Sequence, residues 1–452
     1  MSKKRENLSM QDGVVTWKWL NRRWELWIRQ VLIGSWLMRM PRVTMLAAFV
    51  WRRLLRRTTF VAITGSLGKT TCKELTAAIL QAQAPTFWTI GNQNSSQFVA
   101  LNILRVRPWH RYAVLEVASA APGMMPRIAS VVRPDIAVVL AIRRTHSTQF
   151  ASLDQHAREK EHLLRAASPR GTIVLFDDDP RVTAMSGAGT QRIVRFGVSE
   201  ASHVRARKIA APWPERLTFE VTHESRTLSV KTQLVGEHWI PSVLGALATA
   251  LVVGVPLDAA VRSVGSVPPF RGRLQPIRLP NGAVVLRDDY NASLDGATAA
   301  FQVMRQARAR RRILVFSDLS DFGGNRKKRL RHVAALLPEI AEIAIFAGED
   351  FDYAVRRSVE TGLRPDCVFG FATLRETAEF LRTQMGEGDL VLLKGRTTDH
   401  VARIFFAQFG TLSCWKIRCP KTMLCDECWE LGVSSEDLRR VSLVPPVCDG
   451  RV

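Results

Sequence analysis

The stretch VAITGSLGKTTCKELTAAIL (residues 61–80) has the composition of a loop that binds the phosphates of a nucleotide. Gly65 and Gly68 leave the backbone N–H groups open, and Lys69 supplies a positive charge. The standard loop has the form G-x-x-x-x-G-K-[ST], but Ile63 stands where its first glycine belongs. Two interpretations therefore stay open, a phosphate loop of a different type and a glycine-rich turn between a strand and a helix.

Phosphoryl chemistry also needs a metal ligand, and the sequence offers one close to an apolar stretch. Glu116 ends the run YAVLE, and its carboxylate is a hard oxygen ligand that suits Mg²⁺. On the residues alone, Glu116 is equally well a surface acid at the end of a strand. In the same way, Lys160 in HAREKEHLL reads as an exposed charge on a helix.

The elements around these residues alternate between short apolar runs and helical stretches. TTFVAIT, YAVLEVA, DIAVVLAI and GTIVLFDD predict buried strands, and KTTCKELTAAILQAQ and SVLGALATALVVG predict helices. A second alternating set contains AVVLRDDY, RILVFSD, IAIFAG and DLVLLKG. We therefore predict an α/β fold with a central, mainly parallel sheet and a Rossmann-like C-terminal domain. The expected units are residues 1–58, 59–268, 269–408 and 409–452.

The composition favours anionic partners. The chain has 452 residues and a formal net charge of +23, with 46% hydrophobic and 23% charged residues. A surplus of this size suits nucleic acid, an acidic membrane face or phosphorylated substrates, although a solvated basic surface explains most of the scattered arginines. No nucleic-acid recognition module is evident, so a nucleic-acid partner is not expected.

Residues 14–57 differ from the rest, because they hold six of the twelve tryptophans mixed with arginine. This mixture is typical of a helix in the lipid headgroup region, where indole lies at the boundary and arginine meets phosphate. The alternative is a pair of helices packed on the main body with their arginines directed outwards. No signal peptide is evident, so we expect a cytoplasmic protein, and the first of these two alternatives would place it peripherally at the inner face of the membrane.

The spacing G-x-x-G-K-T-T resembles the phosphate loop of the Mur ligases, the ATP-dependent amide ligases of cell-wall peptide synthesis. The resemblance is closest to the branch that adds D-alanyl-D-alanine to a UDP-muramoyl tripeptide. Further motifs follow in the family's order: TIGNQNSSQF, the RPDIAVV strand, THSTQF with HAREK, FRGRLQPI, DDYNAS, SDLSDFG and LVLLKGR. The similarity covers about residues 59–408 and implies that the opening loop is a true phosphate loop.

The resemblance implies a role for each matching residue. The residues that it assigns to ATP are Gly65, Ser66, Gly68, Lys69, Thr70, Thr71, His238, Arg273, Asp288, Tyr290 and Asn291. Those that it assigns to the substrates are Asn92, Asn94, Ser95, Asp318, Lys394 and Arg396. It assigns catalysis to Lys69, Glu116, His146, Lys160 and Arg273, and Mg²⁺ binding to Thr70, Glu116, His146 and Lys160. In the family, the equivalent of Lys160 is carbamylated by CO₂.

Four departures from the family pattern bear on the substrate. The family's UDP-binding N-terminal domain has no counterpart, and Ser95 replaces its second asparagine. The segment AIRRTH takes the place of the family's N-x-G-P-x-H. In the family's H-N-x-x-N, both asparagines are replaced, by Trp239 and Ser242. Trp239 is still able to stack on adenine. We therefore expect a carboxylate acceptor other than the usual UDP-muramoyl peptide, with an amino acid or peptide as the amine.

The C-terminal stretch CWKIRCPKTMLCDEC is foreign to the family and has cysteines at C-x4-C-x5-C-x2-C spacing. Four thiolates suit tetrahedral Zn²⁺, and in a reducing compartment metal ligation is favoured over disulfides. The predicted ligands are Cys414, Cys419, Cys425 and Cys428, with Cys448 as an alternative and free thiols as the other interpretation.

The sequence thus predicts an ATP-dependent carboxylate–amine ligase that uses Mg²⁺ and acts through an acyl phosphate. The expected substrate is a cell-envelope peptide or a poly-amino acid. The alternative is a catalytically impaired ATP-binding scaffold at the membrane face, in which the changed adenine region and AIRRTH mark lost turnover.

Overall fold

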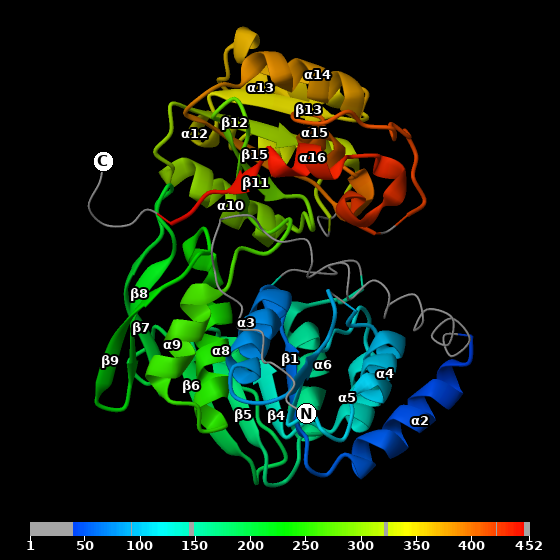
Figure 1. The fold of residues 1–452 in the computed structure, drawn as a ribbon, viewed down its shortest axis with the longest axis vertical. Helices are drawn as coiled ribbons and strands as arrows, with labels where there is room; N and C mark the ends of the chain where they lie inside the picture. Colours follow the sequence, from blue (N-terminus) through cyan, green and yellow to red (C-terminus); the bar gives the residue numbers. More distant parts are fainter. Residues whose placement is uncertain (1–38, 92, 144–148, 321–323, 422, 447–452) are drawn as a thin grey trace, which may run out of the picture.

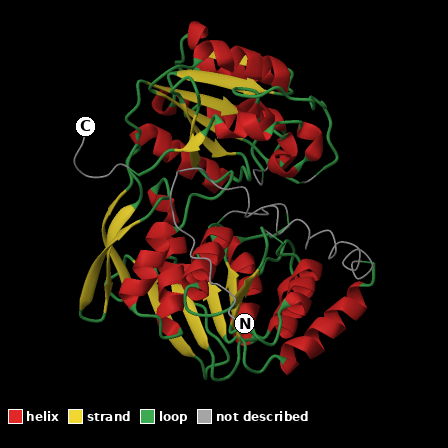
Figure 2. Cartoon of the chain, viewed as in Figure 1, coloured by secondary structure: helices red, strands yellow, loops and turns green. Residues whose placement is uncertain are grey.

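A computed structural model of the chain describes residues 39–91, 93–143, 149–320, 324–421 and 423–446. It consists of two α/β bodies, one built around each of two sheets (Figure 1). Helices flank both sheets, and an antiparallel extension projects from one edge of the first sheet (Figure 2).

The first sheet has nine strands and is parallel except at one edge. Its order is β2 (Thr86–Trp88), β3 (Tyr112–Glu116), β1 (Thr59–Thr64), β4 (Ile136–Val139), β5 (Thr172–Phe176), β6 (Arg192–Gly197), β7 (Val204–Ala210), β8 (Thr218–His223) and β9 (Arg226–Lys231). Strands β7, β8 and β9 pair antiparallel. The parallel strands β1, β3 and β4 are buried almost throughout, as expected for strands covered on both faces.

The helices around this sheet form two groups. One group packs α3 (Lys69–Gln81) with α8 (Ile240–Val252) and α9 (Leu257–Ser266). The other joins α4 (Ser96–Arg105), α5 (Met124–Val132) and α6 (Leu153–Arg165), with α2 (Pro41–Leu54) on its outer side. The short elements are α7 (Pro180–Thr183) and the 3-10 turn η1 (Glu237–Trp239).

The second sheet has seven strands, of which five are parallel. Its order is β14 (Val368–Phe371), β13 (Ile343–Ala347), β12 (Arg311–Phe316), β15 (Asp389–Lys394), β11 (Val284–Asp288), β10 (Gln275–Arg278) and β16 (Ser442–Leu443). The last two strands are antiparallel. Its helices are α10 (Leu294–Gln306), α11 (Arg326–Ala334), α12 (Leu337–Ile340), α13 (Phe351–Glu360), α14 (Leu374–Gln384) and α15 (Ala402–Phe406).

The cysteine-bearing end of the chain packs on this second body. Besides β16 it contains the 3-10 turns η4 (Cys425–Glu427) and η5 (Trp429–Leu431) and the helix α16 (Ser435–Arg439). Strand β16 pairs with β10 through Ile277 and Leu443, so the end of the chain extends the sheet.

The predicted fold class is confirmed, because both sheets are mainly parallel and alternate with helices. The antiparallel extension of β7, β8 and β9 was not predicted, since its half-exposed strands lack a continuous apolar run. Among the described helices, none combines the length and apolar character needed to cross a membrane.

Candidate active site

The turn between β1 and α3 is a loop that only glycine can form. Gly65 and Gly68 have φ of 144° and 77°, values that favour glycine. A Cβ on Gly65 would lie 2.7 Å from the Leu140 Cβ, and one on Gly68 would lie 2.3 Å from the Ser242 Oγ. Gly68 precedes the first residue of α3, and the N-terminal N–H groups of a helix that follows such a loop are suited to bind an anion.

The cationic side chain of this loop is folded over it. The Lys69 Nζ donates to the carbonyls of Gly65 and Ser66, at 2.9 Å each. An ammonium in this position faces the space that bound phosphates occupy in a loop of this kind. Thr71, which is also a predicted ATP contact, is fully buried.

Three segments far apart in the sequence meet beside the loop. The Thr70 Oγ1 donates to the Glu116 Oε2 at 2.8 Å, and the Asn94 Nδ2 donates to the Glu116 Oε1 at 2.7 Å. From the second body, the Arg273 Nη2 donates to the Thr70 Oγ1 at 3.1 Å. Glu116 is only 1% exposed. A hydroxyl, a carboxylate and a guanidinium are therefore adjacent at the mouth of a phosphate loop.

A buried lysine that sequence reasoning missed supports this arrangement. The Lys73 Nζ donates to the carbonyls of Thr89 at 2.6 Å and Gly91 at 2.8 Å, and it pairs with Glu74 at 2.6 Å. It thereby holds the segment that leads to Asn94. Its signal is its spacing, because a residue four positions after Lys69 lies on the same side of a helix.

Lys160 is buried. The residues alone predicted an exposed charge on a helix, and that prediction is wrong. The side chain lies on α6 and is 2% exposed. Burial, with the nearby Lys69 ammonium, lowers the pKa of Lys160 well below its usual value, although Glu159 opposes this shift. Glu159 itself accepts from the backbone N–H groups of Gly123 at 2.9 Å and Met125 at 2.6 Å. Lys160 thus carries an amine that loses its proton readily.

Two predicted residues, Asn92 and His146, lie outside the described residues.

The described part of the altered AIRRTH segment is hydrogen-bonded to the phosphate loop. The Ser66 Oγ donates to the Arg143 carbonyl at 3.0 Å and accepts from the Arg143 N–H at 2.9 Å. Asp179 accepts from the Ile142 N–H at 2.7 Å. The changed sequence therefore still supports the loop.

On the second body, Lys394 at the end of β15 joins two of the predicted ATP contacts. Its Nζ lies 2.5 Å from the Asp288 Oδ2 and donates to the Asn291 carbonyl at 2.6 Å. The guanidinium of Arg273 lies over the Tyr290 ring, 4.6 Å from its centroid. Asp288, Tyr290 and Arg273 therefore form one surface that faces the phosphate loop of the first body through Thr70.

Asp318 and Arg396, both predicted substrate contacts, lie together in an arginine cluster. The Asp318 carboxylate accepts from Arg329 at 2.7 and 2.8 Å and lies 3.4 Å from the Arg396 Nη2. Arg396 is fixed in turn by Asp399, 2.7 Å from its Nη2. Ser95, the remaining substrate prediction, immediately precedes α4.

Two residues on the predicted adenine side, Trp239 and Ser242, are used to support the fold. The Trp239 indole is packed in the core, and its Nε1 donates to the Val235 carbonyl at 3.0 Å, so the expectation that it is free to stack on adenine is wrong. The Ser242 Oγ donates to the Gly68 carbonyl at 3.1 Å and supports the loop. Burial and the Lys394 ammonium lower the pKa of His238 to about 3, which keeps its imidazole neutral.

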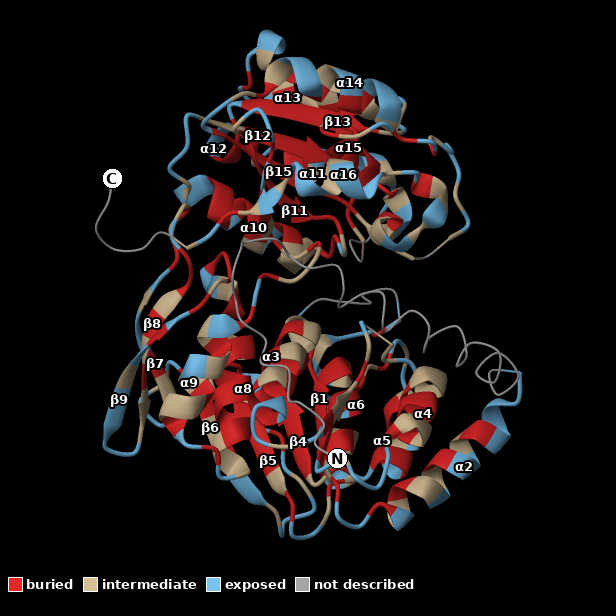
Figure 3. Ribbon diagram, in the orientation of Figure 1, coloured by how far each residue is buried: buried red, intermediate tan, exposed pale blue. Residues whose placement is uncertain are grey.

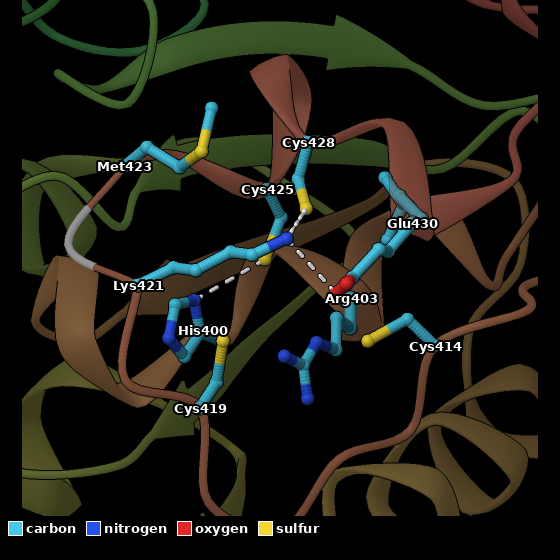
Figure 4. Close-up of a pocket in the computed structure, with 10 residues that line it drawn as sticks. His400, Arg403, Cys414, Cys419, Lys421, Met423, Cys425, Cys428 and Glu430 are labelled. Atoms are coloured by element: carbon cyan, nitrogen blue, oxygen red, sulfur yellow. Dashed lines mark hydrogen bonds and ion pairs between the residues drawn. The ribbon is translucent and has the colours of Figure 1, made fainter.

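All four predicted zinc cysteines line one pocket in the C-terminal segment, together with His400 (Figure 4). The Cys425 Sγ lies 3.4 Å from the His400 Nδ1. The Lys421 ammonium also enters this pocket, 3.3 Å from the Cys428 Sγ. As the described side chains stand, no three of His, Cys, Asp or Glu are arranged to hold a metal ion.

The fold and this geometry define a class of nucleotide-binding proteins, in which a phosphate loop on one α/β body faces an arginine from a second. Comparison with known families narrows the class. Residues 63–250 match the Mur ligase middle domain, and residues 272–397 match the Mur ligase glutamate ligase domain. The chain belongs to the Mur ligase family, as the sequence motifs predicted.

Individual relatives support the assignment of the chain to this family. The UDP-N-acetylmuramoyl-tripeptide–D-alanyl-D-alanine ligase of Escherichia coli (strain K12) is 31% identical over 306 residues, which are 68% of this chain and 66% of the relative. The enzyme of that name from Mycobacterium tuberculosis (strain H37Rv) is 26% identical, over 80% of this chain and 74% of its own. The chain thus spans about two thirds of the Escherichia coli relative.

Among solved structures, MurF from Acinetobacter baumannii superposes with a TM-score of 0.73 at 26% identity, over 81% of this chain and 79% of that one. MurF from Thermotoga maritima, solved in complex with ADP, has a TM-score of 0.68 at 19% identity, over 80% of this chain and 83% of its own, a likeness of fold.

Proposed function

We propose that this protein is an ATP-dependent ligase that joins a carboxylate to an amine and releases ADP and phosphate. The observation that carries the proposal is the meeting of Thr70, Glu116 and Arg273 beside the loop of Lys69. A non-catalytic scaffold, the alternative, has no need of an arginine from a second body at the phosphate end of the nucleotide.

The reaction proceeds in two steps. A carboxylate oxygen of the acceptor attacks the γ-phosphorus of ATP, the bond to the bridging oxygen breaks and ADP leaves. The amine then attacks the carbon of the acyl phosphate, an amide bond forms, and phosphate departs as the nitrogen loses a proton. Lys69 and Arg273 neutralise the charge that develops on the transferring phosphoryl group. Closure of the two bodies keeps water from the acyl phosphate.

Mg²⁺ fits this site, because a hydroxyl and a buried carboxylate are adjacent at the loop. Thr70 and Glu116 would hold the ion, together with His146 and a carbamylated Lys160, and the ion would supply charge neutralisation at the phosphates. The lowered pKa of Lys160 supports carbamylation, since only the neutral amine reacts with CO₂.

The names of the relatives, UDP-N-acetylmuramoyl-tripeptide–D-alanyl-D-alanine ligases, support a proposal about the substrates. We propose an acceptor from the same broad chemistry, a peptide carboxylate of a cell-envelope precursor or of a poly-amino acid, and an amino acid or short peptide as the amine.

ADP release with Mg²⁺-ATP and a panel of acceptor–amine pairs tests this function. The panel contains UDP-muramoyl tripeptide with D-alanyl-D-alanine, single amino acids and glutamate oligomers, with and without added bicarbonate. We expect release that depends on one pair and on Mg²⁺, rises with bicarbonate and falls at least about 100-fold in Lys69→Ala. ATP binding without release for any pair would favour the scaffold. A rate indifferent to bicarbonate would contradict carbamylation of Lys160.

We further propose that the C-terminal cysteines bind a structural Zn²⁺. The support is the convergence of Cys414, Cys419, Cys425 and Cys428 on one pocket, with the C-x2-C turn closed by a bond from the Cys428 N–H to the Cys425 carbonyl at 3.0 Å. Binding requires the Lys421 ammonium to leave the sulfurs. Its ion pair with Glu430, 3.0 Å away, offers a partner outside the thiols.

Metal analysis of the purified protein tests the zinc proposal. We expect about one zinc per chain, lost in Cys425→Ser/Cys428→Ser but kept in Cys72→Ser, whose thiol is buried in the first body. A metal-free wild-type protein with four titratable thiols in this segment would instead show that the cysteines are free.

We also propose that the protein works in the cytoplasm at the inner face of the membrane. The support is the surface of helix α2, which exposes apolar side chains and arginines and lies apart from the active-site residues.

A further inference from the structure

Helix α2 carries an apolar face that no described residue covers. Of the ten large hydrophobic residues exposed in the described chain, five lie on this helix or at its start. These are Met40, Val43, Leu46, Val50 and Leu54, with Leu46 and Leu54 more than 60% exposed. Single exposed apolar residues are common, but four of the ten on one helix of 14 residues, with a fifth directly before it, form a patch.

The spacing of these five residues places them on one side of the helix. Steps of three or four residues return to the same side of an α-helix, and the five residues follow one another at such steps. The opposite side is buried in the first body, where Ala48 is fully enclosed and Thr44 is 1% exposed. In Figure 3, α2 lies at the outer edge of this body. The apolar side therefore faces outwards.

The helix is held firmly, so the exposure belongs to an ordered element. The buried Arg52 donates to the carbonyls of Val132 at 2.8 Å and Arg133 at 2.7 Å, and it pairs with Asp135 at 3.0 Å. The Trp51 Nε1 donates to the Val106 carbonyl at 2.9 Å. These contacts fix the rotation of α2 about its axis and thus the direction of the apolar side.

The charges around this apolar side have one sign. Residues 39–58 contain six arginines and no acid, and Arg39, Arg42, Arg56 and Arg57 are exposed. The loop 107–111, with sequence RPWHR, lies at the C-terminal end of α2, where the Arg111 Nη1 donates to the Arg57 carbonyl at 3.0 Å. Its Trp109 is 69% exposed. An apolar stripe with a rim of arginines thus lies on α2, and an exposed indole lies on the loop at the end of this helix.

The charge pattern indicates which kind of partner fits this surface of α2. In a two-fold contact between copies of this chain, the same surface lies on both sides, so arginine would meet arginine with no acid to pair it. A nucleic acid would meet the arginines, but the outward leucines and valines would gain nothing from it. A surface of anionic lipid satisfies both groups, because apolar side chains enter the acyl boundary while arginines meet lipid phosphates.

We propose that α2 and the loop 107–111 dock this protein on an anionic membrane, with the helix axis in the plane of the interface. A helix of 14 residues is about 21 Å long and lies on a bilayer rather than crossing it. The inference deepens the peripheral location proposed above, and it does not depend on the ligase reaction.

Sedimentation of the full chain with vesicles tests the proposal. The probes are vesicles of phosphatidylcholine alone and vesicles that also contain phosphatidylglycerol. The stripe variant is Leu46→Gln/Val50→Gln/Leu54→Gln, and the matched control is Ile193→Gln/Val198→Gln/Ile417→Gln, three exposed apolar residues elsewhere. We expect binding to the anionic vesicles only, weakened by salt, and about tenfold or more weaker in the stripe variant but unchanged in the control.

Three results would overturn the proposal. One is wild-type binding that the stripe variant retains, which would assign the membrane contact to another segment. Another is an absence of binding to anionic vesicles. The third is a dimer in analytical ultracentrifugation that only the stripe variant abolishes, which would make the face a contact between copies. ADP release without vesicles is expected to be unchanged in the stripe variant, so a failure of docking is distinguishable from a failure of the ligase proposal.

Discussion

Replacing Arg273 with alanine is expected to slow ADP formation by about 1000-fold or more while ATP still binds. The guanidinium comes from the second body and reaches the Thr70 Oγ1, 3.1 Å away, so it lies where the γ-phosphate of ATP meets the phosphate loop. An arginine supplied across such a boundary stabilises charge mainly in the transition state, where its removal costs about 10³–10⁵ in rate. Since Lys69 and the loop remain, ground-state binding changes little.

Single-turnover formation of ADP, with ATP affinity measured separately, checks this prediction. Arg278→Ala is the matched control, because Arg278 lies five residues further on and is exposed on β10. Arg273→Lys keeps the charge but not the two-pronged geometry, and we expect it to recover only part of the rate. A kcat for Arg273→Ala within a few fold of wild type would show that Arg273 does not act on the transferred phosphoryl group.

Replacing Arg287 with methionine is expected to destabilise the second body by about 3–5 kcal/mol. Arg287 is 2% exposed and lies between two acids, with its Nη2 2.7 Å from the Asp289 Oδ2 and its Nη1 2.6 Å from the Asp426 Oδ1. Its guanidinium also stacks near the Phe405 ring, 4.8 Å from the centroid. Methionine would leave the buried Asp289 carboxylate beside Asp426, whose remaining contact with Arg271 is 3.5 Å long, and the repulsion and lost solvation of the two carboxylates cause the loss.

Urea unfolding followed by a probe in the second body measures this effect. Arg310→Met is the control, because Arg310 is 56% exposed and its acid, Asp389, keeps a second partner in Arg311, so we expect a loss of no more than about 1 kcal/mol. Adding Asp426→Asn to Arg287→Met should restore part of the stability. Equal losses in the Arg287 and Arg310 variants would contradict the prediction.

The ion pair between Arg287 and Asp426 also joins the cysteine-bearing segment to the active site. Asp426 lies inside the C-x2-C turn, and Arg287 is adjacent in sequence to Asp288, the acid that pairs with Lys394. Another arginine, Arg271, lies 3.5 Å from the same carboxylate. We therefore expect Arg287→Met to lower ADP release as well as stability.

The sequence by itself determined the fold class, because local patterns carry that information. Continuous apolar runs predict strands buried on both faces, and their alternation with helices predicts parallel sheets. Gly65 and Gly68 between an apolar run and a helical stretch left a phosphate loop and a glycine-rich turn both open, and the family's motifs favoured the phosphate loop. Motif order then indicated the Mur ligase family.

Only the tertiary structure decided how the side chains are used. The contact of Arg273 with Thr70 spans 203 residues, and that of Arg287 with Asp426 spans 139. No local pattern encodes such distances, because they depend on how the two bodies and the end of the chain pack. For the same reason Lys160 resembles a surface charge in sequence but is buried, and Trp239 lies in the core. Local periodicity specifies elements, whereas burial and partners depend on the neighbours that folding brings from elsewhere in the chain.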